Sequence, residues 1–366
     1  MVRVSIFTTG TGFDSINCSS ELVPRISNMA RKKPYFLLSI DVEGDNVWSR
    51  PRDVTCRNAG FLQRFQDLCE RFRLKPTYLT NYEMAMDPVF QAFGRDVLQR
   101  GAGEIGMHLH AWNSPPIKPL TSDDYHFQPY LTEYPEDVME RKITYLTDLL
   151  EETFQTKMTS HRAGRWGFND TYARILIKRG FLVDCSVTPH ISWRSHLGDP
   201  SKNGGNDYTG FPDRPYFIDP QDVRKQGTSR LLEVPVTVLQ RKRSAFHRVV
   251  EKFSPGNPMK RAVNLLWPPF SMLSLRKGRL SHLVRILGQC LEEDRPYAEF
   301  MTHSSHLMPG GGPAFVTARD IEKVYASLEE LFASTEEAFL GATLSEYYSL
   351  WDASTGDEQQ RKQVPM

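Results

Sequence analysis

The chain has 366 residues, of which 40% are hydrophobic and 24% charged, a composition typical of globular proteins. Its 45 Lys and Arg residues nearly balance 44 Asp and Glu residues, leaving a net charge of +1. This balance argues against a nucleic-acid partner, because such binding depends on neutralising many phosphates. The five cysteines are widely spaced and contain no CxxC pair, so reduced thiols are expected instead of a disulfide framework.

The two ends of the chain differ in composition from the middle. Residues 1–33 are polar and lack the apolar core of a signal peptide, and residues 353–366 form a polar tail. No run of apolar residues reaches the length of a membrane span. We therefore expect a loose N-terminal leader, a single domain over residues 34–352, and a cytoplasmic protein.

The first strong signal is the stretch Tyr35 to Asp45, which reads YFLLSIDVEGD. Its continuous apolar run predicts a strand buried on both faces, as in a parallel sheet. Asp41, Glu43 and Asp45 follow at alternate positions, so their side chains can share one face of an extended chain. Buried carboxylates need a cation, a proton or water, and this stretch is therefore a candidate site.

Strand and helix patterns alternate along the rest of the chain. Apolar spacing, prolines and glycines predict helices over Asn58–Phe72, Pro88–Arg100, Pro135–Phe154, Asn169–Arg179, Ser281–Glu293 and Ala318–Ser334. Short apolar runs predict strands over Thr77–Thr80, Gly103–Leu109, Met158–His161, Phe181–Asp184, Leu231–Leu239 and Tyr297–Thr302, with a closing segment over Phe339–Leu350. The alternation predicts an α/β fold, and ionisable clusters after several strands favour a (β/α) barrel over an open sheet.

Two segments interrupt this alternation and are interpreted as insertions. Residues 188–227 are rich in Gly, Pro, Asp and aromatic residues, and such long loops are usually functional covers. Residues 241–279 contain ten Lys or Arg residues and a single acid, Glu251, interleaved with apolar residues. The basic segment is either a solvated cover over the barrel edge or a peripheral contact with an anionic membrane or phosphates.

A second cluster of ionisable residues lies in GEIGMHLHAW, residues 103–112. His108 and His110 are two residues apart at the end of a predicted strand, so their imidazoles can share one face. Two histidines and a carboxylate are a common ligand set for catalytic zinc, with one position left for water. The alternative is that each histidine is a structural residue of the core.

Further polar clusters follow later strands. SHRAGRWGF, residues 160–168, contains Arg162 and Arg165, and a neighbouring arginine would keep a carboxylate base ionised. The alternative is a surface turn built on the glycines. MTHSSHLMPGGGP, residues 301–313, contains His303, but its glycines lack a following Lys and Ser or Thr, which argues against a P-loop.

Taken in order, these clusters resemble the polysaccharide deacetylase family, also called the NodB-homology or carbohydrate esterase family four proteins. The resemblance covers about residues 35–351. It is strongest to the branch with signatures of the type DVEGD, HLHxW, HRAGR and HSSxLMPGG. It implies a distorted (β/α)7-type barrel, a divalent metal that is usually Zn2+, and removal of N- or O-acetyl groups from sugars.

The resemblance also implies a role for individual residues. Asp41 matches the catalytic base, Arg162 its arginine partner and His303 the general acid. Glu43 matches the metal carboxylate, with Asp45 as the competing candidate, and His108 matches the first metal histidine. Three departures from the widespread motifs affect this assignment: Val42 separates two acids that are usually adjacent, Trp112 occupies the usual second histidine position, and Gly164 replaces a proline. His110 is therefore the expected second histidine ligand.

The substrate is expected to be a sugar or a saccharide precursor of surface polysaccharide biosynthesis. Trp112, Arg165 and Trp193 are expected to contact it, because sugars stack on exposed aromatic rings, and the resemblance places Leu307 in the acyl pocket. A cytoplasmic location favours a nucleotide- or lipid-linked sugar. The alternatives are a hydrolase of another C–N bond on the same fold and a saccharide-binding protein without catalysis.

Overall fold

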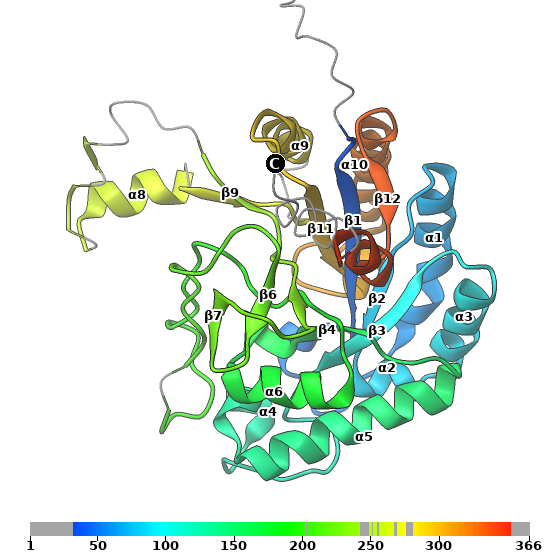
Figure 1. Cartoon of the computed structure of the whole chain (residues 1–366), viewed down its shortest axis with the longest axis vertical. Coiled ribbons are helices and arrows are strands. Elements are labelled where there is room, and N and C mark those ends of the chain that lie inside the picture. Colours follow the sequence, from blue (N-terminus) through cyan, green and yellow to red (C-terminus); the bar gives the residue numbers. More distant parts are fainter. Residues whose placement is uncertain are drawn as a thin grey trace, which may run out of the picture. The chain divides into compact units, whose positions relative to one another are not determined.

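The computed structural model describes residues 32–352, apart from residues 203, 242–248, 251, 255, 267–268 and 276–280. Strands and helices alternate through most of this range (Figure 1). The strands are β1 (Tyr35–Val42), β2 (Thr77–Thr80), β3 (Glu104–Leu109), β4 (Ser160–Ala163), β5 (Val183–Asp184), β6 (Tyr216–Asp219), β7 (Asp222–Gln226), β8 (Leu232–Glu233), β9 (Val238–Gln240), β10 (Phe270–Met272), β11 (Tyr297–His303) and β12 (Leu340–Ala342). The helices are α1 (Leu62–Arg71), α2 (Tyr82–Met86), α3 (Pro88–Gln99), α4 (Asp124–Phe127), α5 (Glu136–Phe154), α6 (Asp170–Arg179), α8 (Pro258–Leu266), α9 (Ser281–Glu292) and α10 (Ala318–Glu336).

A curled ten-stranded sheet forms the centre of the fold: nine strands follow the order β11-β1-β2-β3-β4-β5-β8-β6-β7, and the tenth, β12, pairs with β1 outside this order. Neighbouring strands from β11 to β8 are parallel, whereas β6 is antiparallel to both β8 and β7. Strand β1 is apolar and buried over nearly its whole length. Along one edge β1 pairs with β11. Along its other edge it pairs with β12 near Tyr35 and with β2 from Ser39 onward, so β1 is the most extensively paired strand.

The long helices lie around the outside of the sheet, with α1, α3, α5 and α6 following the strands in chain order (Figure 1). Their ends agree with the capping residues of the sequence. Asn169 accepts a hydrogen bond from Tyr172 N at the start of α6, and Thr317 accepts one from Asp320 N at the start of α10. These caps satisfy backbone N–H groups that the helices themselves leave unpaired.

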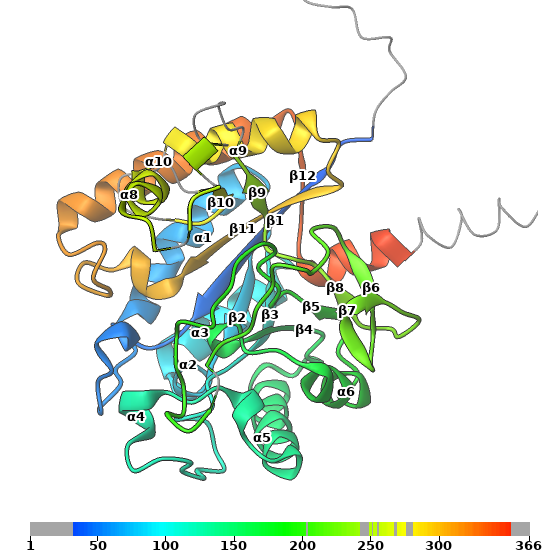
Figure 2. The same cartoon turned by 90° about the vertical axis from the view of Figure 1, so that its left-hand side faces the viewer.

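A small two-stranded antiparallel sheet closes the gap between the last parallel strands and β11. Strands β9 and β10 pair with each other, and both lie near α9 and β11 in Figure 2. Met301 N donates to Leu273 O at 3.1 Å, and Leu273 N donates to Thr237 O at 2.8 Å. These bonds connect β11 to the segment that follows β8, so the sheet curls into the distorted (β/α)7-type barrel that the sequence predicts.

Two predicted elements differ from the structure. The expected strand over Leu231–Leu239 is divided into β8 and β9, because Pro235 between them has no backbone N–H to donate to a ladder. The segment 188–227, expected to be irregular, contains the β6–β7 hairpin. Part of the basic segment 241–279 lies outside the described residues, and its proposed membrane contact stays a prediction.

No helix among the described residues is long and apolar enough to cross a membrane. Within the same part of the chain, Cys56, Cys69, Cys185 and Cys290 are free thiols, as their spacing predicts.

Candidate metal centre and active-site cavity

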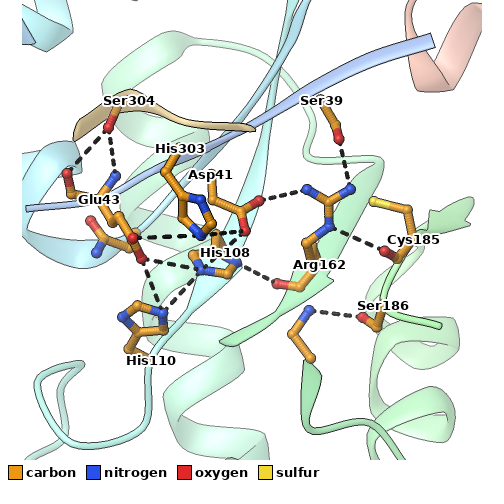
Figure 3. A network of polar contacts seen from close by, with 12 residues as sticks. Ser39, Asp41, Glu43, His108, His110, Arg162, Cys185, Ser186, His303 and Ser304 are labelled. Atoms are coloured by element: carbon orange, nitrogen blue, oxygen red, sulfur yellow. Dashed lines mark hydrogen bonds and ion pairs between the residues drawn. The ribbon is translucent and has the colours of Figure 1, made fainter. Parts of the chain in front are cut away.

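The candidate site lies where four parallel strands end. Asp41, near the end of β1, pairs in register with His303 at the end of β11, and His108 on β3 pairs with Arg162 on β4. The strand register therefore brings together residues from four separate sequence clusters (Figure 3). This is the end of the barrel at which barrel enzymes build their sites.

Glu43, His108 and His110 form a buried group that could hold a metal ion. Their ligand atoms lie within 4.8 Å of one another. His108 Nε2 is 3.0 Å from His110 Nε2, and Glu43 Oε2 is 3.4 Å from His110 Nε2 and 3.8 Å from His108 Nε2. Two ligands of a tetrahedral zinc ion lie about 3.4 Å apart, so these separations match such a site.

The protonation of His108 supports this interpretation. His108 Nδ1 lies 3.0 Å from Arg162 O, and a carbonyl oxygen only accepts, so Nδ1 carries the proton. The Nε2 lone pair of neutral His108 is therefore directed at His110 and Glu43 (Figure 3). A backbone carbonyl that fixes the tautomer in this way is a common support for a metal-binding histidine.

The electrostatics of Glu43 also fit a cation. Glu43 is 2% exposed, and its Oε1 has no hydrogen-bond partner among the described residues. Burial raises the pKa of Glu43 well above its ordinary value, and the negative charges of Asp41 and Glu83 raise it further. A divalent cation would remove this penalty by balancing the carboxylate charge.

Asp41 has a different environment because it forms an ion pair with Arg162. Arg162 Nη1 donates to Asp41 Oδ1 at 2.6 Å, and the arginine side chain is fully buried. Burial alone would raise the pKa of Asp41, but Arg162 together with His108 and His303 lowers it to about 2. Asp41 is therefore a carboxylate at neutral pH.

Arg162 is itself held by three further acceptors. Its Nη2 donates to Ser39 Oγ at 2.6 Å and to Glu299 Oε1 at 2.5 Å, and its Nε donates to Cys185 O at 3.1 Å. Ser39 also donates to Glu299. These contacts fix the guanidinium plane, so Asp41 is held in one orientation.

Asp45 is not part of the group that could hold a metal ion. Asp45 Oδ2 accepts from Thr55 Oγ1 and Arg57 N, and Oδ1 accepts from both nitrogens of Asn58. Both oxygens are therefore occupied in shaping the loop after β1. Of the two acids considered from the sequence, Glu43 is the one that lies beside the histidines.

His303 lies on the opposite side of Asp41 from Arg162 (Figure 3). Its Nε2 is 3.8 Å from Asp41 Oδ2 and 3.8 Å from Glu43 Oε1. Burial lowers the pKa of His303 to about 4, although Asp41 opposes this shift. A protonated His303 would therefore be a strong proton donor.

The site opens into a cavity of about 600 Å³. The predicted substrate residues Trp112, Arg165 and Trp193 all line it, and Trp166 stacks on Trp193 with ring centroids 6.3 Å apart. Leu307 is not among the lining residues, because it is fully buried in the hydrophobic core. Its expected place in the acyl pocket is not supported by this position.

Several residues at the site were not identified from the sequence. Ser39 and Glu299 hold Arg162, and Trp48 and Arg50 line the cavity. Ser39 and Glu299 each lie within an apolar strand pattern, where a lone polar residue is itself a signal of a buried partner. Trp48 and Arg50 lie in a loop without periodicity, and the sequence carried no equivalent signal.

The fold and the site thus define the class of protein: an α/β barrel with a buried group of one carboxylate and two histidines. Neither the protein-family models nor the curated proteins contain a match to this sequence. Among solved structures, a proposed glycoside hydrolase/deacetylase from Parabacteroides distasonis matches with a TM-score of 0.56 and 10% identity, covering 88% of this chain and 72% of that one. This likeness shows a shared fold.

Two further solved structures match more weakly. A proposed polysaccharide deacetylase from Mycobacterium smegmatis has a TM-score of 0.48 and 15% identity, covering 88% of this chain and 95% of that one. The peptidoglycan deacetylase PdaC from Bacillus subtilis has a TM-score of 0.42 and 10% identity, covering 91% of this chain and 99% of that one.

Proposed function

We propose that this chain is a metal-dependent hydrolase that removes an N- or O-acetyl group from a saccharide. The observation that carries the proposal is the convergence of Glu43, His108 and His110 beside the ion-paired Asp41. An aromatic cavity next to these groups is the kind of surface on which sugars stack. The residues that converge are those that the resemblance to polysaccharide deacetylases implies.

The roles of the side chains follow from their positions. Glu43, His108 and His110 would hold a divalent ion, which we propose is Zn2+. When bound, the ion would supply Lewis acidity and lower the pKa of a water molecule to about 7. Asp41 is kept ionised by Arg162 and accepts the proton of the attacking water. His303 donates a proton to the departing nitrogen or oxygen.

We propose further that the acetylated sugar is a precursor of a surface polysaccharide. This step is supported by the branch of deacetylases that the motifs resemble, and not by a particular contact.

Release of acetate from N-acetylated and O-acetylated oligosaccharides tests the proposal. We expect Asp41→Asn and His303→Ala each to lower the rate by about 100-fold or more, the usual contribution of a general base or acid. Asp137→Asn is the control, because Asp137 is exposed and pairs only with Arg141 at the surface. Equal rates for the variants and the unmodified protein would exclude these roles. Binding of sugar and metal without any acetate release would instead indicate a saccharide-binding protein.

A further inference from the structure

The cavity contains two arginines that the chemistry above does not use. Arg50, in the loop after β1, and Arg165, in the turn after β4, both line it. Among the described residues, neither guanidinium lies within ion-pair distance of a carboxylate. The other charged side chains of the wall, Asp41 and Glu43, are already engaged by Arg162 and the histidines.

Arg165 is held in place with donors to spare. Its Nη2 donates to Leu197 O at 3.0 Å and its Nη1 to Phe127 O at 3.5 Å, while its guanidinium lies 4.2 Å from the centre of the Tyr130 ring. The two carbonyl oxygens and the Tyr130 ring hold the guanidinium in place but do not neutralise its positive charge. A guanidinium has five N–H donors, so three of those in Arg165 are available to a ligand.

The nearby acid, Glu133, does not neutralise Arg165. Glu133 accepts hydrogen bonds from the backbone N–H groups of Tyr130 and Asp199, and its oxygens form no ion pair with Arg165. Burial lowers the pKa of Arg165, Tyr130 and Glu133 oppose this shift, and the positive charge of Arg50 adds to it. Both arginines line the same cavity, so an anion bound there could interact with each guanidinium.

The backbone at both positions is unusual. Arg50 has φ of 55° and Arg165 φ of 54°, in the left-handed region that residues with a side chain rarely adopt. Neither residue is a glycine or asparagine, for which this conformation is common. Strained conformations of this kind tend to persist where they place a side chain for function.

A second, smaller cavity of about 440 Å³ shares Arg50 and Trp48 with the first. It is also lined by Tyr125 and His126, whereas its remaining arginine, Arg52, pairs with Asp123 at 3.8 Å. Arg50 therefore lies between the sugar-sized cavity and an aromatic extension. A ligand that occupied both cavities would pass Arg50, which lines both, and could reach Arg165, which lines the larger one.

We propose that Arg50 and Arg165 bind a phosphate group attached to the saccharide, so that the substrate is a sugar phosphate ester. Two unpaired guanidiniums match the double negative charge of a phosphate monoester or a diphosphate better than that of a single carboxylate. The group beyond the phosphate extends into the second cavity, toward Tyr125 and His126. This inference rests on the proposed function for the identity of the substrate, but the anion site can be tested without catalysis.

The test is binding of glucose 1-phosphate compared with methyl glucoside, measured by calorimetry with the metal-loaded protein. Neither sugar carries an acetyl group, so hydrolysis does not contribute. We expect glucose 1-phosphate to bind at least about tenfold more tightly, and Arg50→Gln and Arg165→Gln each to remove about tenfold of that affinity. Arg71→Gln is the control, because Arg71 is exposed and pairs with Glu329.

Each outcome supports or overturns the inference. Equal binding of the two sugars, or unchanged affinity in both variants at unchanged melting temperature, overturns it. If Arg165→Gln fails to fold, Arg165→Lys keeps the charge but loses the fork of donors, and an intermediate loss of affinity is expected. Affinity for methyl glucoside should not change in any of these variants.

Two further comparisons separate the related questions. A nucleoside diphosphate sugar that binds more tightly than a prenyl diphosphate sugar in micelles identifies the nucleotide as the source of the phosphate, and the reverse order identifies the lipid. If the protein binds glucose 1-phosphate through both arginines but releases no acetate, the result supports the anion site and contradicts the proposed function. If acetate is released equally fast from neutral and phosphorylated sugars, the result supports the proposed function and contradicts the proposed phosphate site.

Discussion

Arg162 links Asp41, at the candidate site, to Glu299 in the barrel interior. Its guanidinium contacts Asp41, Ser39 and Glu299 while being fully buried. A buried ion pair is costly to break, because removal of one partner leaves the other charge without compensation. Arg162 therefore contributes to both the stability of the barrel and the ionisation of Asp41.

Replacement of Arg162 by Lys should separate charge from geometry. A lysine keeps the positive charge, but its three donors lie on a single nitrogen and cannot replace the planar fork through which Arg162 contacts Asp41, Glu299, Ser39 and the Cys185 carbonyl. We expect Arg162→Lys to lower the free energy of unfolding by about 2–3 kcal/mol and acetate release by about 100-fold. Urea denaturation and acetate assays measure both effects.

Arg64→Lys is a matched control for that experiment. Arg64 forms a bidentate pair with Glu322, but both side chains are exposed. An exposed pair contributes little, so stability and activity should stay unchanged. Equal losses of stability and activity in Arg162→Lys and Arg64→Lys would contradict the idea that burial makes the Arg162 ion pair important.

Glu43 should couple metal binding to pH. Its folded-state pKa is raised by burial and by Asp41, so the metal-free folded state retains a proton that the unfolded chain loses near pH 4.5. Above that pH the folded state binds more protons than the unfolded state, and the metal-free protein loses stability as pH rises. Metal binding displaces this proton.

The drop in melting temperature on treatment with a chelator should therefore grow as pH is raised from 5 to 8. Glu43→Gln should abolish this pH dependence together with most of the metal affinity. A chelator effect that is independent of pH would show that Glu43 is not protonated in the metal-free protein.

The sequence predicts the residues that converge at the candidate site better than the residues that support them. Asp41, His108 and Arg162 stand out because ionisable residues at the ends of apolar strands have few structural roles. Leu307 shows the limit of such reasoning, since its side chain packs into the core and not the cavity. Which way a side chain points beyond a strand end depends on a turn whose conformation the sequence pattern does not determine.

At the level of elements, the loop after β1 decides which acid faces the histidines. Asp45 accepts hydrogen bonds from Thr55, Arg57 and Asn58, which join the start of this loop to its end. The alternating positions of the acids in the sequence do not distinguish Glu43 from Asp45. They differ only because the chain stops being extended after Glu43, so the period of two no longer applies.

Asp45→Asn and Glu43→Gln should therefore have opposite consequences. We expect Asp45→Asn to lower stability by about 1–2 kcal/mol while metal content stays near that of the unmodified protein. Glu43→Gln should lose metal without a comparable loss of stability in the metal-free state. Metal analysis and urea denaturation distinguish them, and loss of metal only in Asp45→Asn would reverse the assignment.

The turn after β4 also sets the position of His110. A Cβ atom at Gly164 would overlap the His110 ring and the carbonyl oxygen of Leu109. We expect Gly164→Ala to displace His110 and to weaken metal binding by about tenfold, the lower end of the effect of disturbing a ligand's support. Gly60→Ala is the control, because nothing lies near its Cβ position. Equal metal affinity in the two variants would contradict this role.

The elements themselves were largely predictable, and the exceptions have physical causes. The amphipathic pattern and capping residues placed α5, α6 and α10 to within about two residues. The split of β8 from β9 follows from Pro235, and the β6–β7 hairpin lacks a strongly apolar alternating pattern. Short strands in polar loops are stabilised by their neighbours, which a local pattern does not contain.

At the scale of the whole molecule, the barrel is organised around β1, which pairs with β2, β11 and β12. Central strands of this kind open only with the entire fold. We expect the amides of Tyr35–Val42 and Tyr297–His303 to exchange with solvent most slowly, and those of the β6–β7 hairpin much faster. Hydrogen-exchange mass spectrometry measures this, and early exchange in β1 would contradict its central place.

The pairing of β1 with β11 also has a consequence for synthesis of the chain. Glu43, His108 and His110 are all made within the first third of the sequence, whereas His303, the register partner of Asp41, emerges near its end. On the ribosome the three residues that could hold a metal ion are therefore available long before the proposed proton donor, and the nascent chain could bind an ion before β11 exists. Pairing of β11 with β1 then brings His303 beside Asp41, so the candidate site is complete only after β11 has been made.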